Sequence, residues 1–293
     1  MNRNRLRRVV SPVCVLLGLI AISYVPPAPA RAADRWNVGR RFDRTLLIVL
    51  ENRTYSQVMN VPYFRQLATR GALFSDAHAI THPSYPNYIA LVAGDTHGIT
   101  DDRPRDLHVA SIADLLHAHG LTWKNYAEGY PGGCSAVSRQ DRYDRKHVPF
   151  INFSSIRARP ERCANVAAAA QFHADRAANN LPNYAFFSPD RDNDGHDTDL
   201  DHVSTWLRGF LEPLLDDAAF MKGTLIIVTF DESDGGEGNH IYTLFLGPMV
   251  KAGYVEPRRI DHYNVLRTIE ENFNLGTLGL EDEAHDPIVT IWN

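Results

Sequence analysis

Two stretches decide the fold of this chain, TLLIVLEN at Thr45–Asn52 and TLIIVTFDE at Thr224–Glu232. Each stretch runs from a block of apolar residues directly into acidic or amide side chains. A near-continuous apolar run is typical of a parallel strand that is buried on both faces. Proteins of the α/β class bind ligands just beyond the carboxyl ends of such strands. The four residues that end the two stretches are therefore predicted to share one site: Glu51, Asn52, Asp231 and Glu232.

The rest of the chain alternates between helical and strand-like patterns. Apolar spacing and cap residues predict helices at residues 63–70, 111–120, 165–179, 203–215 and 263–273. Short apolar runs predict strands at residues 72–80, 121–127, 184–187, 225–230 and 241–246. This alternation indicates an α/β fold with a mostly parallel central sheet and helices on both faces.

A third element, THPSYPNY at Thr81–Tyr88, precedes the apolar run IALVAG. Its two prolines fix the backbone before an expected helix. Ser84 would then lie at a helix start, where free N–H groups favour an anion. We therefore predict that Ser84 is a nucleophile that attacks phosphate, with Asn52 and Asn87 as donors to the phosphoryl oxygens. A helix N-cap is the alternative role of Ser84, and the two roles are compatible.

Several motifs, in this order, resemble those of the bacterial phosphoesterase family. They are E-N after the first strand, H-P-S-x-P-N-Y, N-D-G-H-D at Asn193–Asp197, and D-E-x-D-G-G followed by N-H from Asp231 onward. That family contains secreted acid phosphatases and phospholipases C and is similar to the alkaline phosphatase superfamily. The resemblance therefore implies an alkaline-phosphatase-like fold. Two runs, Arg145–Ile156 and His262–Leu275, resemble a secreted acid phosphatase that acts on phosphatidylinositol 3-phosphate.

The resemblance implies a first metal site formed by Glu51, Asp231 and Glu232 and in contact with Ser84. The superfamily more often has Asp at the first position and Asp-His after the second strand, so this chain departs from its pattern. Oxygen ligands favour Mg²⁺, Mn²⁺ or Ca²⁺ over Zn²⁺. The identity of the divalent metal stays open between these four.

A second metal site would draw on Asp192, Asp194 and His196, with His240 arriving from the loop before a strand. A ligating histidine of the superfamily precedes a strand that ends in Gly-Pro, as His240 precedes IYTLFLGP here. A surface histidine is the alternative for His240, and the number of ions, one or two, stays open. The run Asp190–Asp201 also has the spacing of an EF-hand calcium loop, but a strand is expected where an EF-hand has its first helix.

The first 33 residues have the order of a secretory signal: four arginines, an apolar run from Val13 to Val25, and a small-residue stretch before Asp34. The apolar run is shorter than the roughly 20 residues that a membrane-spanning helix needs. We therefore expect cleavage, export to a secreted or extracytoplasmic location, and no stable membrane anchor. Residues 34–293 would form a single phosphoesterase domain.

Acidic residues dominate the chain that would remain after cleavage. The whole chain has 30 Lys and Arg against 35 Asp and Glu, and residues 1–33 contain five arginines and no acid, which leaves 25 against 35. A domain this acidic lacks the positive footprint of a nucleic-acid-binding protein. An anionic substrate would instead be attracted locally, most directly by bound cations.

Residues 128–160 are rich in Gly, Pro and charge and are expected to form a long surface insertion. Its basic residues Arg145, Lys146 and His147 are candidates for binding a second phosphate or a lipid headgroup. A solvated charged loop is the alternative, because acidic residues are interleaved. In an exported protein, Cys134 and Cys163 are expected to form a disulfide. His97, Asp101 and Asp102 match the family motif without a derivable role.

These observations favour a secreted, metal-dependent phosphomonoesterase, and the resemblance narrows it to an acid phosphatase with phosphatidylinositol 3-phosphate as a candidate substrate. Phosphate monoesters are very hard to hydrolyse, and catalysis depends on positioning and on neutralising oxygen charge. Attack by Ser84 would give a phosphoserine intermediate. Two alternatives stay open: a phospholipase C that cleaves phospholipid diesters, and a non-catalytic secreted calcium-binding protein. The oligomeric state is not indicated by the sequence.

Overall fold

The computed structural model describes residues 39–293, so the expected secretory signal lies outside the described residues. Eight strands form one sheet, and two short strands form a separate hairpin. The strands are β1 (Arg44–Leu50), β2 (Ala72–His78), β3 (Trp123–Ala127), β4 (Arg139–Gln140), β5 (Tyr143–Asp144), β6 (Val166–Ala168), β7 (Tyr184–Ser188), β8 (Thr224–Phe230), β9 (His240–Leu246) and β10 (Tyr254–Glu256).

Helices connect the strands and flank the sheet. The α-helices are α1 (Tyr55–Asn60), α2 (Pro62–Ala68), α3 (Ser84–Ala93), α4 (Ile112–Ala118), α5 (Ser154–Arg157), α6 (Pro160–Cys163), α7 (Ala170–Ala177), α8 (Leu200–Leu215), α9 (Ala218–Met221), α10 (His262–Phe273) and α11 (Glu281–Ala284). The 3₁₀ helices are η2 (Arg145–His147), η3 (Pro149–Asn152) and η4 (Glu237–Asn239).

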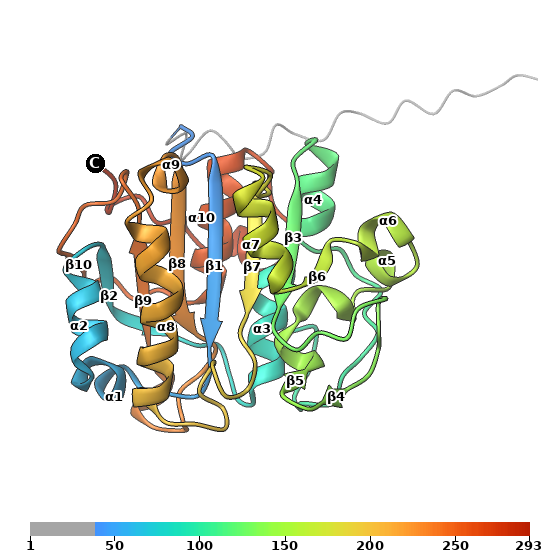
Figure 1. Cartoon of the computed structure of the whole chain (residues 1–293), viewed down its shortest axis with the longest axis horizontal. Helices are drawn as coiled ribbons and strands as arrows, with labels where there is room; N and C mark the ends of the chain where they lie inside the picture. Colours follow the sequence, from blue (N-terminus) through green and yellow to red (C-terminus); the bar gives the residue numbers. More distant parts are fainter. Residues whose placement is uncertain (1–38) are drawn as a thin grey trace, which may run out of the picture. The chain divides into compact units, whose positions relative to one another are not determined.

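The central sheet has the strand order β10-β2-β9-β8-β1-β7-β3-β6 (Figure 1). β1 lies between β7 and β8 and is parallel to both. β9 is antiparallel to β2 and β8. The mostly parallel sheet predicted from the alternating pattern is therefore confirmed, with β9 as the exception.

Helices cover both faces of the sheet, as predicted. In Figure 1, α7 and α8 lie in front of the sheet, whereas α3 and α10 lie behind it. α8 buries Val203, Leu207, Leu211 and Leu214, whose spacing of three or four residues places them on one helical face. α3 is buried along its whole length and packs against α10.

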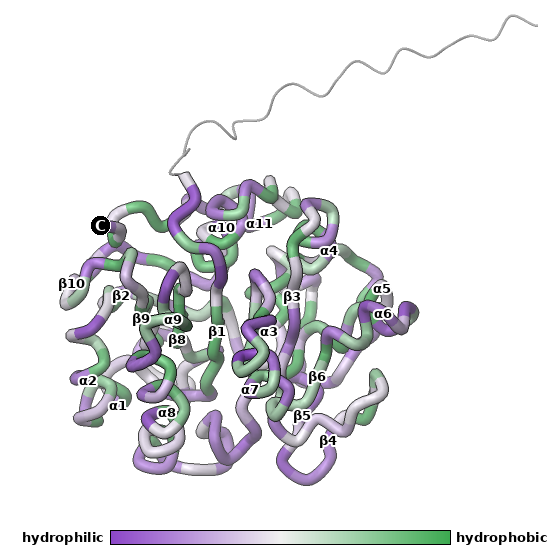
Figure 2. Tube along the Cα trace, turned by 45° about the horizontal axis from the view of Figure 1, so that its top comes forward, coloured by the Kyte–Doolittle hydropathy of each residue, from purple (hydrophilic) through white to green (hydrophobic). Residues whose placement is uncertain are grey.

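The two stretches that open the sequence form the centre of the sheet. All seven residues of β8 are buried, and so are the last six of β1. Figure 2 shows both strands as hydrophobic, while the loops beyond their carboxyl ends are hydrophilic. Polar side chains that follow these strands therefore lie at the boundary between the core and a polar edge.

The expectation of a surface insertion at residues 128–160 agrees with residues 131–142, none of which is buried, but not with residues 143–153, nearly all of which are buried. Val148, Phe150, Ile151 and Phe153 are each at most 1% exposed. They are buried because η2 and η3 pack against α3. The apolar residues of this segment are interleaved with Gly, Pro and charges, which hid its core-forming part from pattern reading. The predicted disulfide between Cys134 and Cys163 is present.

A second correction concerns the helix expected at residues 165–179. Its first part forms the edge strand β6, which pairs with β3, and the helix α7 begins at Ala170. Alanine suits a helix by propensity, but backbone pairing with β3 takes precedence here. Within residues 39–293, no helix is both long enough and apolar enough to cross a membrane.

Candidate active site

The register between β1 and β8 places their terminal carboxylates side by side. Leu50 is paired with Phe230, so Glu51 and Asp231 follow at the same level of the sheet. The backbone N–H of Asp231 donates to the carbonyl of Leu50 at 2.8 Å. The N–H of Glu51 donates to the carbonyl of Asp194, in the loop after β7, also at 2.8 Å. Three acidic residues that are distant in sequence therefore meet at one edge of the sheet.

Ser84 is the first residue of α3 and faces these carboxylates. Its side chain is 1% exposed. The Oγ atom lies 3.0 Å from Oε2 of Glu51, 2.9 Å from Oε1 of Glu232 and 3.4 Å from Oδ1 of Asn52. A hydroxyl carries one proton and can donate it to only one carboxylate at a time. The serine oxygen is therefore surrounded by acceptors that could take its proton.

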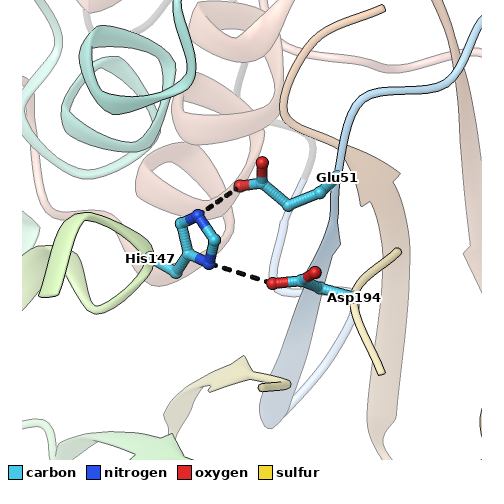
Figure 3. A group of neighbouring side chains, drawn as sticks. All are labelled: Glu51, His147 and Asp194. Atoms are coloured by element: carbon cyan, nitrogen blue, oxygen red, sulfur yellow. Dashed lines mark ion pairs between the residues drawn. The ribbon is translucent and has the colours of Figure 1, made fainter. Parts of the chain in front are cut away.

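His147 bridges two buried carboxylates (Figure 3). Its Nε2 lies 3.0 Å from Oε1 of Glu51, and its Nδ1 lies 2.9 Å from Oδ2 of Asp194. These four atoms form ion pairs and have no hydrogen-bond partner within residues 39–293. One ligand atom from each of the three residues lies within 4.8 Å of the others, so the three could hold a metal ion.

Burial and mutual repulsion dominate the electrostatics of the site. Burial raises the pKa of Asp231 well above its usual range, and the charges of Glu51 and Glu232 raise it further. Burial is the largest influence on Glu51 and would raise its pKa, but His147, Lys146 and Tyr88 together outweigh it and lower that pKa to about 2. Burial would lower the pKa of His147, yet Glu51 and Asp194 raise it to about 10. Burial also raises the pKa of Asp194 to about 7 although His147 faces it, so among these buried acids the charge of Glu51 is the one most strongly stabilised.

A divalent cation, which the motifs of the sequence led us to expect, fits this donor set. The site offers carboxylate oxygens from Glu51 and Asp194 and an imidazole nitrogen from His147. Oδ2 of Asp231 is also buried and has no hydrogen-bond partner among the described residues. Buried charges are stable when they are paired or bind metals. The mixed nitrogen and oxygen donors are compatible with Zn²⁺ as well as with Mg²⁺ or Mn²⁺, so the identity of the metal is not resolved.

An open pocket of about 390 Å³ borders Glu232 and gives access to the site. Its lining comes from three loops, those after β1, before α3 and after β8: Asn52, Arg53, His82, Pro83, Glu232, Ser233, Asp234 and Gly235.

A family model described as the phosphoesterase family matches residues 50–276. The chain belongs to the phosphoesterase family. The matched range spans β1 to α10 and includes every residue of the site described above. The family that the sequence motifs indicated is thereby confirmed.

Curated relatives of the chain carry phosphatase names. The chain is 36% identical to a probable acid phosphatase of Kluyveromyces lactis, over 83% of this chain and 61% of that protein. It is 32% identical to a phosphatidylinositol-3-phosphatase of Mycobacterium tuberculosis, over 99% of this chain and 95% of that protein. An acid phosphatase of Aspergillus fumigatus is 34% identical, over 89% of this chain and 61% of that protein. The chain thus spans about three fifths of the length of the fungal relatives it matches.

Solved structures with the same fold include a protein of the superfamily expected from the sequence. A protein of the alkaline phosphatase superfamily from Vibrio parahaemolyticus matches with a TM-score of 0.57 and 13% identity, over 84% of this chain and 70% of that one. Murine ectonucleotide pyrophosphatase/phosphodiesterase 5 matches with a TM-score of 0.54 and 13% identity, over 81% of this chain and 96% of that one. The alkaline-phosphatase-like fold is confirmed.

The residues predicted to form a second metal site do not all lie together in the structure. Asp194 lies beside Glu51 and pairs with His147, whereas Oδ2 of Asp192 forms an ion pair with Nε of Arg142 at 2.8 Å. Nδ1 of His196 lies 2.8 Å from Asp197, although its ring is close to that of His147, with centroids 5.8 Å apart.

The fourth predicted member, His240, lies elsewhere. Its ring stacks between those of Tyr55, at 4.4 Å, and His78, at 5.0 Å. His240 is the first residue of β9, which pairs with β2 and β8. That register directs its ring toward β2 and α1 rather than toward Asp194. The position of His240 before a strand therefore does not by itself place its ring beside Asp194, as the predicted metal site required.

Asn87 takes a structural role instead of the predicted one. Its Oδ1 accepts the N–H groups of Ile80 and Thr81, and its Nδ2 donates to the carbonyls of Thr81 and Pro83. All of its hydrogen-bonding capacity serves the loop before α3. Asn52 remains beside Ser84, and its backbone N–H donates to Oδ1 of Asp231 at 3.2 Å.

The basic cluster predicted to bind substrate is buried. Arg145 pairs with Asp106 at 2.6 Å and donates to the backbone carbonyl of Arg105. Lys146 pairs with Asp102 at 3.0 Å, and His147 lies in the carboxylate group. These three side chains lie inside the fold because η2 packs on α3.

Sequence reasoning missed two neighbours of the serine. The imidazole of His82 contacts Glu232. The ring of Tyr88, one helical turn after Ser84, stacks on His147 with centroids 5.3 Å apart. Both belong to the H-P-S-x-P-N-Y motif, so their spacing from Ser84 was a usable signal.

The run Asp190–Asp201 is not a helix-loop-helix. β7 precedes it, and Oδ1 of Asp190 accepts backbone N–H groups of Asp192 and Asn193 within its own turn. Asp201 lies in the first turn of α8.

Proposed function

We propose that this chain is a metal-dependent phosphomonoesterase that works through Ser84. The observation that carries the proposal is the position of the Ser84 hydroxyl, buried at the start of a helix and within 3.0 Å of carboxylates from Glu51 and Glu232. Carboxylates in this position can take the hydroxyl proton. At this helix start the N–H of Ser84 can receive an anionic phosphoryl oxygen, because the N–H of Tyr85 is bound by Asp102 and Pro86 has none.

Ser84 attacks the phosphorus atom, and the bond from phosphorus to the ester oxygen breaks. The alcohol leaves with a proton, and Ser84 carries the phosphoryl group. Water then attacks the phosphoserine and releases phosphate. A divalent cation bound among Glu51, Asp194, His147 and Asp231 would supply the positive charge that the phosphoryl oxygens need.

The proposed substrates are phosphate monoesters, in line with the acid phosphatase names of the relatives. Phosphatidylinositol 3-phosphate is the specific candidate, supported by the relative that matches nearly end to end. We further propose that residues 1–33 act as a secretory signal and that residues 34–293 function outside the cytoplasm. The pocket at Glu232 is open, which suits a headgroup presented from a larger molecule.

The test measures phosphate release from para-nitrophenyl phosphate by wild type and Ser84→Ala, with and without chelator. Ser84→Ala is expected to reduce kcat at least about 1,000-fold, because the nucleophile is lost. Ser75→Ala, a half-buried serine on β2, is the matched control and should retain activity. Undiminished turnover by Ser84→Ala would exclude the covalent mechanism. Products from phospholipids decide between phosphatase and phospholipase C, because only the latter releases a phosphorylated headgroup.

A further inference from the structure

Asp102 joins the start of the nucleophile helix to a buried lysine. Its Oδ1 accepts the backbone N–H of Tyr85, the residue after Ser84, at 3.0 Å. Its Oδ2 accepts a hydrogen bond from Nζ of Lys146 at 3.0 Å. One carboxylate therefore connects two elements that are otherwise separate in sequence, α3 and η2.

Lys146 is 5% exposed, so its ammonium depends on the anions that face it. Asp102 is one of them, and the negative charge of Glu51 also acts on it. Lys146 directly precedes His147, which contacts Glu51 and Asp194. A shift of Lys146 would therefore be transmitted along the backbone to His147 and through charge to Glu51.

We propose that Asp102 is a positioning residue for the reaction at Ser84, an inference that rests on the proposed function. The carboxylate sets the direction of the first turn of α3 and divides the charge of Lys146 between itself and Glu51. Without it, Lys146 retains only the charges of Glu51 and Asp144, and its pull on Glu51 draws that carboxylate away from the Ser84 hydroxyl. A displacement of this kind weakens turnover more than substrate binding, because it misaligns the reacting groups.

The adjacent residue, Asp101, provides a matched control. Its carboxylate pairs with Arg103 and Arg105 in the surface loop. Asp101→Asn and Asp102→Asn remove the same charge from neighbouring positions, so a general effect of net charge or loop stability would appear in both. Asp102→Glu keeps the negative charge on a longer side chain and tests whether that charge is enough to restore kcat.

The experiment measures kcat and KM of the metal-loaded protein with para-nitrophenyl phosphate for wild type and these three variants. Asp102→Asn should lower kcat by about 10- to 100-fold with KM changed less than about threefold. Asp101→Asn should stay within about twofold of wild type, and Asp102→Glu should recover part of the loss. Amide hydrogen exchange of Tyr85 should be faster in Asp102→Asn, because its acceptor is weakened.

Equal kcat for Asp102→Asn and Asp101→Asn, in an active wild type, would overturn this inference and leave the proposed function standing. A lower melting temperature with unchanged kcat below that temperature would also overturn it, since it would assign Asp102 a purely structural role. An inactive wild type would instead overturn the proposed function. Independently of activity, if the amide hydrogen of Tyr85 exchanged at the same rate in Asp102→Asn as in wild type, Asp102 would not be the residue that holds the start of α3.

Discussion

His147 is the side chain that links the two buried carboxylates of the site, Glu51 and Asp194. It is 1% exposed and has a carboxylate at each ring nitrogen. Tyr88 stacks on its face, which fixes the plane of the ring. The His147 pKa of about 10 keeps the ring charged between the two carboxylates, so binding a metal would displace a proton from it. A fixed ring orientation strengthens metal binding once that proton has left. The same position held by a residue without a ring nitrogen would leave Glu51 and Asp194 in mutual repulsion.

His147→Gln is therefore expected to weaken divalent-cation binding and to lower phosphatase activity by about 10- to 100-fold. His240→Gln is the matched control, because its ring lies between Tyr55 and His78. Titration calorimetry with Mn²⁺ and steady-state kinetics on both variants measure the difference. The reverse result, with His240→Gln losing the cation and His147→Gln keeping it, would restore the ligand set suggested by strand position alone.

The residues that follow strand ends or begin a helix could be predicted, whereas the position of His147 among the carboxylates, from inside residues 128–160, could not. Glu51, Asp231 and Ser84 each follow a recognisable boundary, so the sheet topology alone brings them together. His147 reaches the site only because Val148 and Phe150 bury η2 and η3 against α3. That packing depends on shape across elements, which a periodic pattern does not encode.

At the scale of elements, the loop before α3 determines where Ser84, the proposed nucleophile, lies. The side chain of Asn87, within α3, bonds to backbone groups of Ile80, Thr81 and Pro83. Nδ2 of Asn239, from η4, donates to the same Thr81 carbonyl at 2.9 Å. The loop is thus held from its own helix and from the segment that follows β8.

Asn87→Ala should destabilise the protein by about 1–3 kcal/mol, because the partly buried backbone N–H groups of Ile80 and Thr81 lose their acceptor. Urea denaturation, followed by tryptophan fluorescence, measures the change. Asn180→Ala, an exposed asparagine, serves as the control and should change stability by less than about 0.5 kcal/mol. An equal stability for both variants would show that water replaces the Asn87 amide without cost.

The contact between α7 and β3 includes a carboxylate, Asp175, whose contribution to the free energy of unfolding is expected to fall at acid pH. Burial raises the pKa of Asp175, but hydrogen bonds from Lys124, Tyr126 and Gln171 outweigh it and lower the pKa overall. A lowered pKa contributes stability above the unfolded value of about 3.9, and the contribution is lost as the pH falls through the folded pKa. Asp175→Asn should therefore cost about 1–3 kcal/mol at pH 7 and much less near pH 3.

Denaturation curves at pH 7 and pH 3 for wild type and Asp175→Asn test this prediction. The difference in free energy of unfolding between the two proteins should shrink toward acid pH. A difference that is the same at both pH values would mean that the carboxylate charge plays no part and that only the side-chain shape matters.

At the scale of the whole molecule, an excess of negative charge opposes both the binding of an anionic substrate and the burial of acidic side chains. Residues 34–293 have 25 Lys and Arg against 35 Asp and Glu. Four of these acids, Glu51, Asp194, Asp231 and Glu232, are at most 5% exposed and lie around one serine. An anionic substrate approaching such a surface is repelled unless bound cations reverse the local field. The same cations would also relieve repulsion between the buried acids, so binding and folding are coupled.

Metal removal should therefore lower thermal stability independently of turnover. A cation at 100 times its dissociation constant stabilises the folded state by about 2.7 kcal/mol, which corresponds to roughly 5–10 °C in a domain of this size. Calorimetry after chelation, with Mg²⁺, Mn²⁺, Ca²⁺ and Zn²⁺ added back singly, measures the shift. Glu51→Gln should abolish it, because a carboxylate shared by Ser84 and His147 is lost, whereas Ser75→Ala should retain it. If none of the four cations raises the melting temperature of wild type, the buried acids are neutralised by protons and His147 alone, and the metal-dependent mechanism is excluded.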